Sequence, residues 1–120
     1  MKGMGWMVDA LFDQMKEFLN MDTEISFEEF DRYYKEVVSF LNDGWQQLDE
    51  EQGLKMLFIL DNLKANSEDR AKRRTKDAKK YKKMEERTGI WTGAMINRLR
   101  ELGLSQEEIS KRYEELYEAV

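Results

Sequence analysis

Apolar side chains recur at helical spacing along most of the 120-residue chain. Between residues 4 and 19 they follow one another at intervals of three and four, which places them along one face of a helix. The same spacing returns in later segments, and the chain contains no proline, the residue that breaks helix interiors. The pattern predicts helices over residues 4–19, 27–42, 50–64, 67–88, 90–102 and 106–120.

Three of these predicted helices have a capping residue in front of them. Ser26 with Glu29, and Ser105 with Glu108, have the spacing of a capping box, in which each side chain accepts a hydrogen bond from a free backbone N–H at the helix start. Asp49 precedes the segment that begins at residue 50, and aspartate is a preferred N-cap residue. We therefore expect these helices to begin where the apolar spacing begins.

Glycines mark the predicted helix ends. Gly44, Gly89 and Gly103 each follow a helical segment, and glycine readily adopts the left-handed backbone conformation that closes many helices. At the last of these turns, Leu104 is placed to make the hydrophobic contact that accompanies such a cap. Ser67 is ambiguous, because it either caps a separate basic helix or lies inside one continuous rod formed with the preceding segment.

The segment 54–60, LKMLFIL, is apolar at six of its seven positions, so its helix belongs in the core or in a dimer interface. Leu57 is expected to be buried, and Trp91 and Leu116 are expected to pack the C-terminal part back onto the core. The predicted fold class is all-α. It is a compact bundle of five to six helices in a single domain, residues 1–120, with one long basic helix and a C-terminal helical hairpin. The surplus of aromatic residues favours a homodimer.

Charge is distributed unevenly along the sequence. The formal net charge is −5, yet residues 70–87 hold ten of the twenty Lys and Arg residues and only three acidic residues. Residues 1–69 hold six basic and sixteen acidic residues. When residues 67–88 are placed on one helix, seven cations share an arc of about 120°. These candidate nucleic-acid-binding residues are Lys72, Arg73, Lys76, Lys79, Lys80, Lys83 and Arg87.

A stripe of seven cations repels itself and needs counterions or an acidic partner. The sequence therefore predicts a non-enzymatic, regulatory protein that holds the phosphate backbone of DNA or RNA on this basic helix. The alternative is a protein-interaction module, an adaptor or an inhibitor, whose basic helix pairs with an acidic surface in an oligomer or partner. A third interpretation is that the stripe is a solvated face, or docks on the acidic half of the same chain.

The chain contains no cysteine and no histidine. It therefore forms no disulfide and offers no thiolate or imidazole to a metal ion, and chemistry that pairs a nucleophile with a histidine base is excluded. No apolar run approaches the ~18 residues needed to cross a membrane. The N-terminal segment has an acidic residue in its apolar part and lacks a small-residue cleavage site. We expect a cytoplasmic protein with no cofactor, no metal and no membrane partner.

Residues 96–112, INRLRELGLSQEEISKR, resemble the first half of the helix-turn-helix in Xre-type phage repressors. The resemblance implies major-groove reading of DNA and points to a bacterial or phage source. It covers seventeen residues. After Arg112 the sequence YEELYEAV continues the same helix, where the repressor pattern has a turn and a recognition helix.

Two acidic motifs resemble metal sites. Residues 24–30 resemble the exit of an EF-hand calcium loop, but Phe18 and Thr23 occupy the positions of its first ligand and its glycine. Glu28 and Asp31 have the E-x-x-D spacing of all-helical nucleotide pyrophosphatases, and no convincing second pair faces them. We therefore expect neither calcium binding nor hydrolysis from these motifs.

Overall fold

The computed structural model describes residues 4–120 of the chain, and these residues fold into helices. Within this range there are five α-helices and no strand, so the predicted all-α class is confirmed. The helices are α1 (Met4–Leu19), α2 (Phe27–Gly44), α3 (Glu50–Ala71), α4 (Ala78–Glu101) and α5 (Gln106–Ala119), with a short 3-10 turn, η1 (Trp45–Gln47), after α2.

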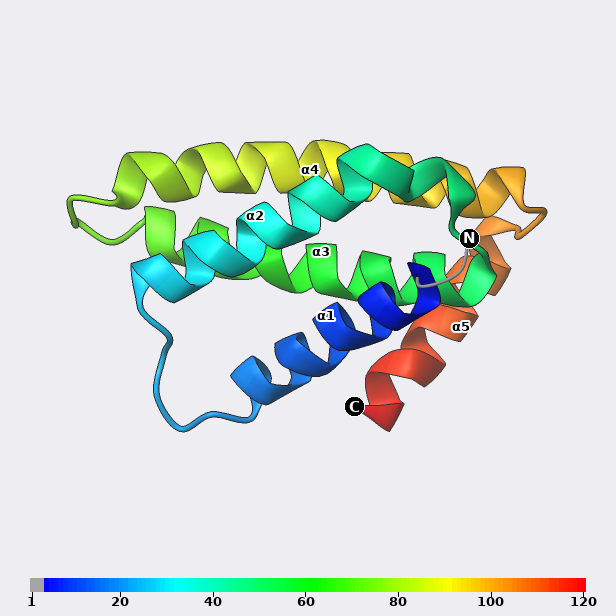
Figure 1. Cartoon of the computed structure of the whole chain (residues 1–120), viewed down its shortest axis with the longest axis horizontal. Helices are drawn as coiled ribbons and strands as arrows, with labels where there is room; N and C mark the ends of the chain where they lie inside the picture. The colour runs from blue at the N-terminus through cyan, green and yellow to red at the C-terminus, as the bar shows by residue number, and fades with distance from the viewer. Residues whose placement is uncertain (1–3) are drawn as a thin grey trace.

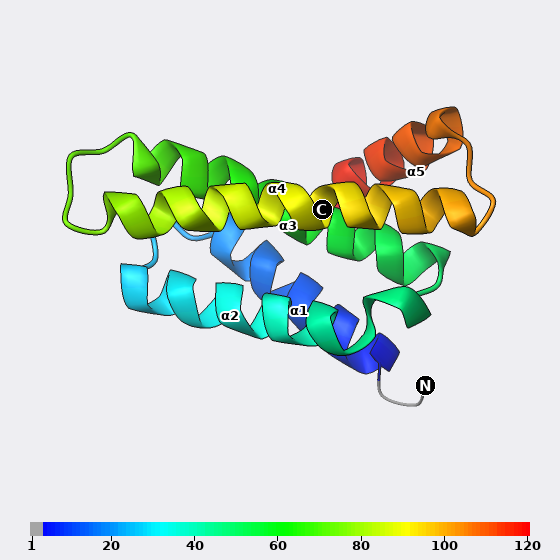
Figure 2. The same ribbon diagram turned by 90° about the horizontal axis from the view of Figure 1, so that it is seen from above.

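Helices α3 and α4 run side by side in opposite directions along the long axis of the molecule (Figure 1). Figure 2 shows α1 and α2 together on one side of this pair, while α5 folds back near its other side. The loop 72–77 joins α3 to α4 at one end of the molecule, and the turn between α4 and α5 lies at the opposite end (Figure 1). The connection 20–26 between α1 and α2 lies toward the same end as the loop 72–77.

Helix α3 forms the centre of the core. Leu57, predicted to be buried, is 5% exposed, and Phe58 and Leu60 on other sides of the same helix are also buried. The ring of Phe12 from α1 packs edge-on against Phe58, with centroids 5.3 Å apart. Full burial of one such side chain contributes about 1.5–3 kcal/mol. An apolar helix surrounded by other helices is what the segment 54–60 predicts.

The predicted capping residues begin their helices. The carboxylate of Asp49 accepts a hydrogen bond from Gln52 N at 2.8 Å, and the Gln52 side chain accepts one from Asp49 N at 3.0 Å. Ser105 forms the same reciprocal pair with Glu108. The hydroxyl of Ser26 accepts from Glu29 N at 3.1 Å, although the return bond of a complete capping box is not among the hydrogen bonds of the described residues.

Gly103 closes α4 as its sequence predicts. Its φ angle is 102°, in the left-handed region, and its N–H donates to the Arg100 carbonyl at 3.0 Å. Leu104 N–H donates to the Leu99 carbonyl at 3.2 Å, which completes a Schellman motif. Gly44 behaves differently, because its φ angle is −156° and the chain continues directly into η1. The left-handed cap predicted at Gly44 is therefore wrong.

The long basic helix predicted over residues 67–88 is also wrong. Helix α3 runs past its predicted end at residue 64, through Ser67, to Ala71. The chain then turns back through the loop 72–77, and α4 runs from Ala78 through Gly89 to Glu101 without a break. Ser67 caps no helix, since its side chain is fully buried and its hydroxyl donates to the Leu63 carbonyl. Most of the basic residues of α4 lie in its first part, and Arg98 and Arg100 lie in its last turn.

Burial of apolar surface explains why the chain turns at this loop. Folding α4 back onto α3 buries Tyr81, Met84 and Thr88 on one helix, and Leu63 and Ser67 on the other. A straight rod would leave these faces in water, at a cost of about 25 cal/mol for each Å² of apolar surface. The gain from packing two long helices therefore exceeds the cost of ending one helix and starting another.

Close approaches at two glycines and one hydrogen bond align α3 with α4. A Cβ atom placed on Gly53 would come within 2.9 Å of the Leu99 side chain, and one placed on Gly89 would lie 3.5 Å from the Lys64 side chain. Near the loop, Arg70 Nη1 donates to the Tyr81 hydroxyl at 2.9 Å. The close approach at Gly53 lets the two helices pack tightly at the end far from the loop.

Helix α5 packs against α3 after the turn at Gly103. Arg112 donates to Glu50 at 2.7 Å, and the ring of Tyr113 lies 6.5 Å from that of Phe58. Leu116 is half-buried against the core. These contacts hold α5, which contains the last residues of the repressor-like stretch, on the protein body.

Candidate functional site

The basic residues gather at one end of the molecule. We define the basic tip as residues 72–87, which comprise the loop 72–77 and the first part of α4 (Figure 1). It contains nine Lys and Arg residues and three acidic residues, in a protein whose formal net charge is −5. The tip therefore carries a local positive charge that the rest of the chain does not share.

The seven candidate residues divide into two groups. Lys72, Arg73 and Lys76 lie in the loop 72–77, and the other four lie on α4. All seven side chains are exposed. The predicted arc of seven on one helix is wrong because the helix breaks between residues 71 and 78. The four that remain on a helix keep a spacing that places them within about 100° of one another. They are Lys79, Lys80, Lys83 and Arg87.

Arg73 is held by the acidic part of the same chain. Its Nη1 and Nη2 donate to the two carboxylate oxygens of Glu24, both at 2.6 Å, and Nη2 also donates to Asp69 at 2.7 Å. These hydrogen bonds raise the pKa of Arg73 and lower the pKa of Glu24. All three side chains are exposed, so the pairs are screened by water and salt. Arg73 is therefore the candidate residue that docks on the protein's own acidic half.

Most of the other candidates have no such partner. Lys72 lies 3.6 Å from Glu68, a long ion pair on one face of a helical turn. Among the ion pairs of the described residues, none involves Lys76, Lys79, Lys83 or Arg87. These side chains are available to an external polyanion.

A groove beside the basic tip joins α4 to α2. It has a volume of about 280 Å³ and includes Lys80, Lys83 and Arg87 on one side. Phe27 and Tyr34 line the α2 side, and Lys80 Nζ lies 5.0 Å from the centre of the Phe27 ring. Burial raises the pKa of the Tyr34 phenol, and the nearby Arg87 opposes this shift. Aromatic rings next to cations are typical of surfaces on which unpaired bases stack.

Sequence reasoning missed the aromatic part of this groove. Phe27 and Tyr34 have the spacing of core residues on α2, and each is only partly buried. The incomplete burial could not be read from the sequence, because it depends on where α4 packs. The adjacent pair Tyr33 and Tyr34 gave no decisive signal, since neighbouring positions on a helix can both be buried, as Phe40 and Leu41 are on α2.

The remaining basic residues of the stretch 70–87 have other environments. Arg70 is 8% exposed and lies inside the protein, where it contacts aromatic rings. Lys82 forms an ion pair with Glu85 at 3.0 Å, which raises the pKa of Lys82. Arg74 is exposed in the loop. Arg70 is therefore removed from any surface that a phosphate backbone contacts.

The acidic motifs do not gather into a larger site. Among the described residues, no group of three or more acidic side chains is placed to hold a metal ion. Glu28 is exposed, and Asp31 pairs with Lys35 at 2.8 Å. In the range 4–120, no helix combines the length and the apolar character that a membrane span requires.

Comparison with known proteins gives no relative. No protein-family model matches the chain, and neither a curated protein nor a solved structure matches it significantly.

Proposed function

We propose that the protein binds the phosphate backbone of nucleic acid through the basic tip, as a regulatory protein that acts by binding and catalyses no reaction. This proposal rests on a set of exposed candidate cations at one end of an acidic protein. These cations take part in none of the ion pairs found among the described residues. They are Lys76, Lys79, Lys80, Lys83 and Arg87. Cations held close together without acidic partners repel one another, and a polyanion relieves that repulsion.

The arrangement of the tip suits a backbone more than a single phosphate. The loop residue Lys76 and the helical residues up to Arg87 are spread along the end of the molecule, so they can contact successive phosphates. Side chains that contact phosphates fix position and carry no base preference. The groove between α4 and α2, lined by Phe27 and Tyr34 on its α2 side, offers an additional place for an unpaired base. We therefore expect binding with little sequence preference.

A mobility shift at low salt tests this function. The probes are a 20-base-pair DNA duplex, an RNA hairpin and a single strand of DNA. Wild-type protein should retard all three. A variant with Lys76, Lys79, Lys83 and Arg87 reversed to glutamate should retard none. Lys64, Arg100 and Lys111 are exposed on other parts of the chain, so their combined reversal, three residues against four, is the control and should leave binding in place. Equal binding by both variants would contradict the proposal.

A second candidate function is a protein-interaction module that self-associates as a homodimer. Trp6 is 74% exposed at the edge of a largely apolar groove of about 610 Å³ between α1 and α2. Arg32 lies toward one end of the α2 side of this groove, and Asp43 lies at the other. Two copies of α2 packed in antiparallel orientation would therefore bring unlike charges together.

Sedimentation equilibrium of wild-type protein and Trp6→Ser tests this candidate. Stable dimers bury large apolar side chains at their centre, so a wild-type dimer that is lost in Trp6→Ser would support the proposed homodimer. A wild-type protein that is monomeric at ~100 μM would contradict the homodimer.

A further inference from the structure

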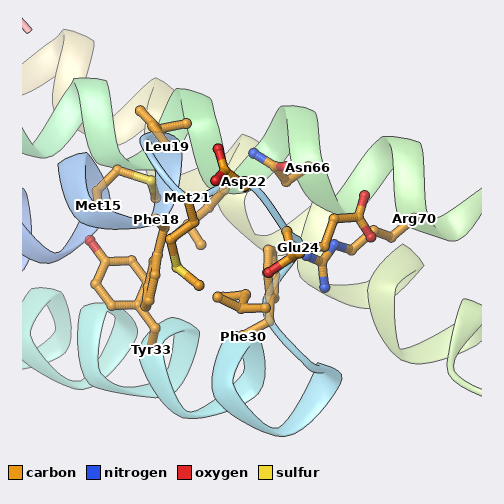
Figure 3. A pocket seen from close by; sticks show the side chains of 13 residues that line it. Met15, Phe18, Leu19, Met21, Asp22, Glu24, Phe30, Tyr33, Asn66 and Arg70 are labelled. Atoms are coloured by element: carbon orange, nitrogen blue, oxygen red, sulfur yellow. The ribbon is translucent and has the colours of Figure 1, made fainter.

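A pocket lies between α1, α2, α3 and the connection 20–26 (Figure 3). Its volume is about 260 Å³. This is just below the ~300–1,000 Å³ of pockets that take drug-sized molecules, so it suits a smaller ligand. The two ends of the pocket differ in character, and no residue of the basic tip lines it, although Glu24 in its lining accepts hydrogen bonds from Arg73.

One end of the pocket is apolar. Met15 and Phe18 from α1, Tyr33 from α2 and Leu63 from α3 line it. The phenol of Tyr33 donates to the Leu11 carbonyl at 2.6 Å, so its hydroxyl is already satisfied and its ring forms the wall. Surfaces of this kind favour the apolar body of a ligand.

The other end contains a buried cation. Figure 3 shows the Arg70 side chain reaching from α3 toward Phe30, with Glu24 beside it. Arg70 is 8% exposed, and the centre of its guanidinium lies 4.8 Å from the centre of the Phe30 ring and 5.5 Å from that of Tyr81. Nη1 donates to the Tyr81 hydroxyl. Nε is buried and has no hydrogen-bond partner among the described residues.

No carboxylate of the described residues forms an ion pair with Arg70. Glu24 is close enough to be influenced by its charge, but both oxygens of Glu24 accept hydrogen bonds from Arg73. Contacts with aromatic rings compensate a buried cation only in part. Burying an incompletely paired guanidinium is costly, and functional sites are where such a cost is commonly found.

We propose that this pocket binds a small monocarboxylate with an apolar body, such as a medium-chain carboxylic acid. The carboxylate accepts hydrogen bonds from the Arg70 guanidinium, whose planar donors match its geometry. The apolar body lies against Met15, Phe18 and Leu63. Asn66 of α3 lines the pocket together with Arg70. Its side-chain amide donates one N–H to the Asn62 carbonyl, and its second N–H and its oxygen remain for a ligand.

The charges around the pocket favour a monoanion over a phosphate. Asp22 and Glu24 line the pocket on the connection 20–26. They repel a dianion about twice as strongly as a carboxylate, because Coulomb energy scales with charge. No residue of the basic tip lines the pocket, so this proposal and the proposed nucleic-acid binding can fail independently.

Calorimetric titration of the full chain with octanoate at neutral pH tests the proposal, with 1-octanol and acetate as the matched probes. Octanol has the apolar body without the charge, and acetate has the charge without the body. We expect saturable 1:1 binding of octanoate with a dissociation constant at or below ~1 mM. Octanol and acetate should each bind at least about ten-fold more weakly. Equal affinities for octanoate and octanol, or no saturable binding of octanoate, would overturn the proposal.

Two kinds of variant locate the site. Arg70→Gln removes the charge and should weaken octanoate about ten-fold or more while leaving octanol unchanged. Because Arg70 is buried, this variant must first show the wild-type circular dichroism. Met21 is partly exposed on the pocket rim, so Met21→Glu and Met21→Gln provide a test that does not disturb the core. Octanoate should bind Met21→Glu about five-fold more weakly than Met21→Gln, because the added carboxylate repels it. Equal octanoate affinities in this pair would place the ligand elsewhere and overturn the proposal.

Discussion

The guanidinium of Arg73 donates two hydrogen bonds of 2.6 Å to the carboxylate of Glu24, which lies 49 residues earlier in the sequence. This pair ties the loop of the basic tip to the connection between α1 and α2. The pair also engages one of the seven candidate cations. The guanidinium of Arg73 already donates to a carboxylate, so it is less available to bind a phosphate. The structure thus distinguishes a cation used within the protein from those that face solvent.

Glu24→Gln should free Arg73 from its two bonds to Glu24 and leave only the bond to Asp69, which makes the guanidinium more available to an external polyanion. We expect tighter binding to a DNA duplex and a steeper salt dependence, by about 0.9 in the log–log slope for one additional phosphate contact. Fluorescence anisotropy over a range of salt concentrations measures both quantities. Glu28→Gln removes the same charge from an exposed neighbouring position and is the control. An unchanged slope in Glu24→Gln would mean that Arg73 does not reach the nucleic acid even when it is released.

The same pair predicts a pH dependence. Hydrogen bonds from Arg73 lower the pKa of Glu24 in the folded protein. A carboxyl group with a lowered folded pKa adds stability above its unfolded pKa, near 4.3, and this stability is lost as pH falls through the folded value. Wild-type protein should therefore melt at a slightly higher temperature than Glu24→Gln at pH 7. The two melting temperatures should converge as pH falls through the acid range, and a gap that stays constant down to about pH 2 would contradict the prediction.

Leu57→Ala should destabilise the protein by about 2–5 kcal/mol, because it leaves a cavity in the centre of the core. Leu19→Ala removes the same atoms from a side chain that is 43% exposed, and it should change the unfolding free energy by less than about 0.5 kcal/mol. Urea denaturation followed by circular dichroism measures both. Equal effects in the two variants would mean that α3 is not the centre of the core.

Two glycines in helices should respond differently to replacement by alanine. Gly93 lies on the exposed side of α4 with nothing within 4 Å of an added Cβ, so Gly93→Ala should stabilise by about 0.5–1 kcal/mol through helix propensity. Gly53→Ala would bring a Cβ within 2.9 Å of the buried Leu99 side chain. Overpacking of this kind costs about 1–3 kcal/mol, which should cancel or outweigh the gain. Equal stabilisation by both, measured by urea denaturation, would show that α3 and α4 are not closely packed at this point.

Local signals made parts of this fold predictable. The caps at Asp49 and Ser105 and the turn at Gly103 depend on residues next to one another in sequence, so the sequence alone identifies them. Burial of Leu57 follows from the apolar run around it. The predicted end at Gly89 failed because a glycine inside a helix is tolerated when the helix packs on a partner.

The turn at residues 72–77 was not predictable in this way. The loop sequence KRRTKD contains no glycine and no proline, so it carries no strong signal that ends a helix. The turn follows from long-range packing, in which Tyr81 contacts Phe27 and Phe30 of α2 and Arg70 of α3, and a pattern of local spacing does not contain that information. The same limitation hid the groove beside Tyr34 and the buried position of Arg70.

Salt dependence of binding to a DNA duplex tests the role of the basic tip most directly. Five to six exposed cations that neutralise phosphates together should give a log–log slope of about −4 to −6 in fluorescence anisotropy. Reversal of Lys76, Lys79, Lys83 and Arg87 should abolish binding and leave the circular dichroism unchanged, because all four side chains are exposed. A wild-type protein that forms no complex at low salt, together with a reversed variant that loses its native size in gel filtration, would contradict nucleic-acid binding and favour a protein-interaction module.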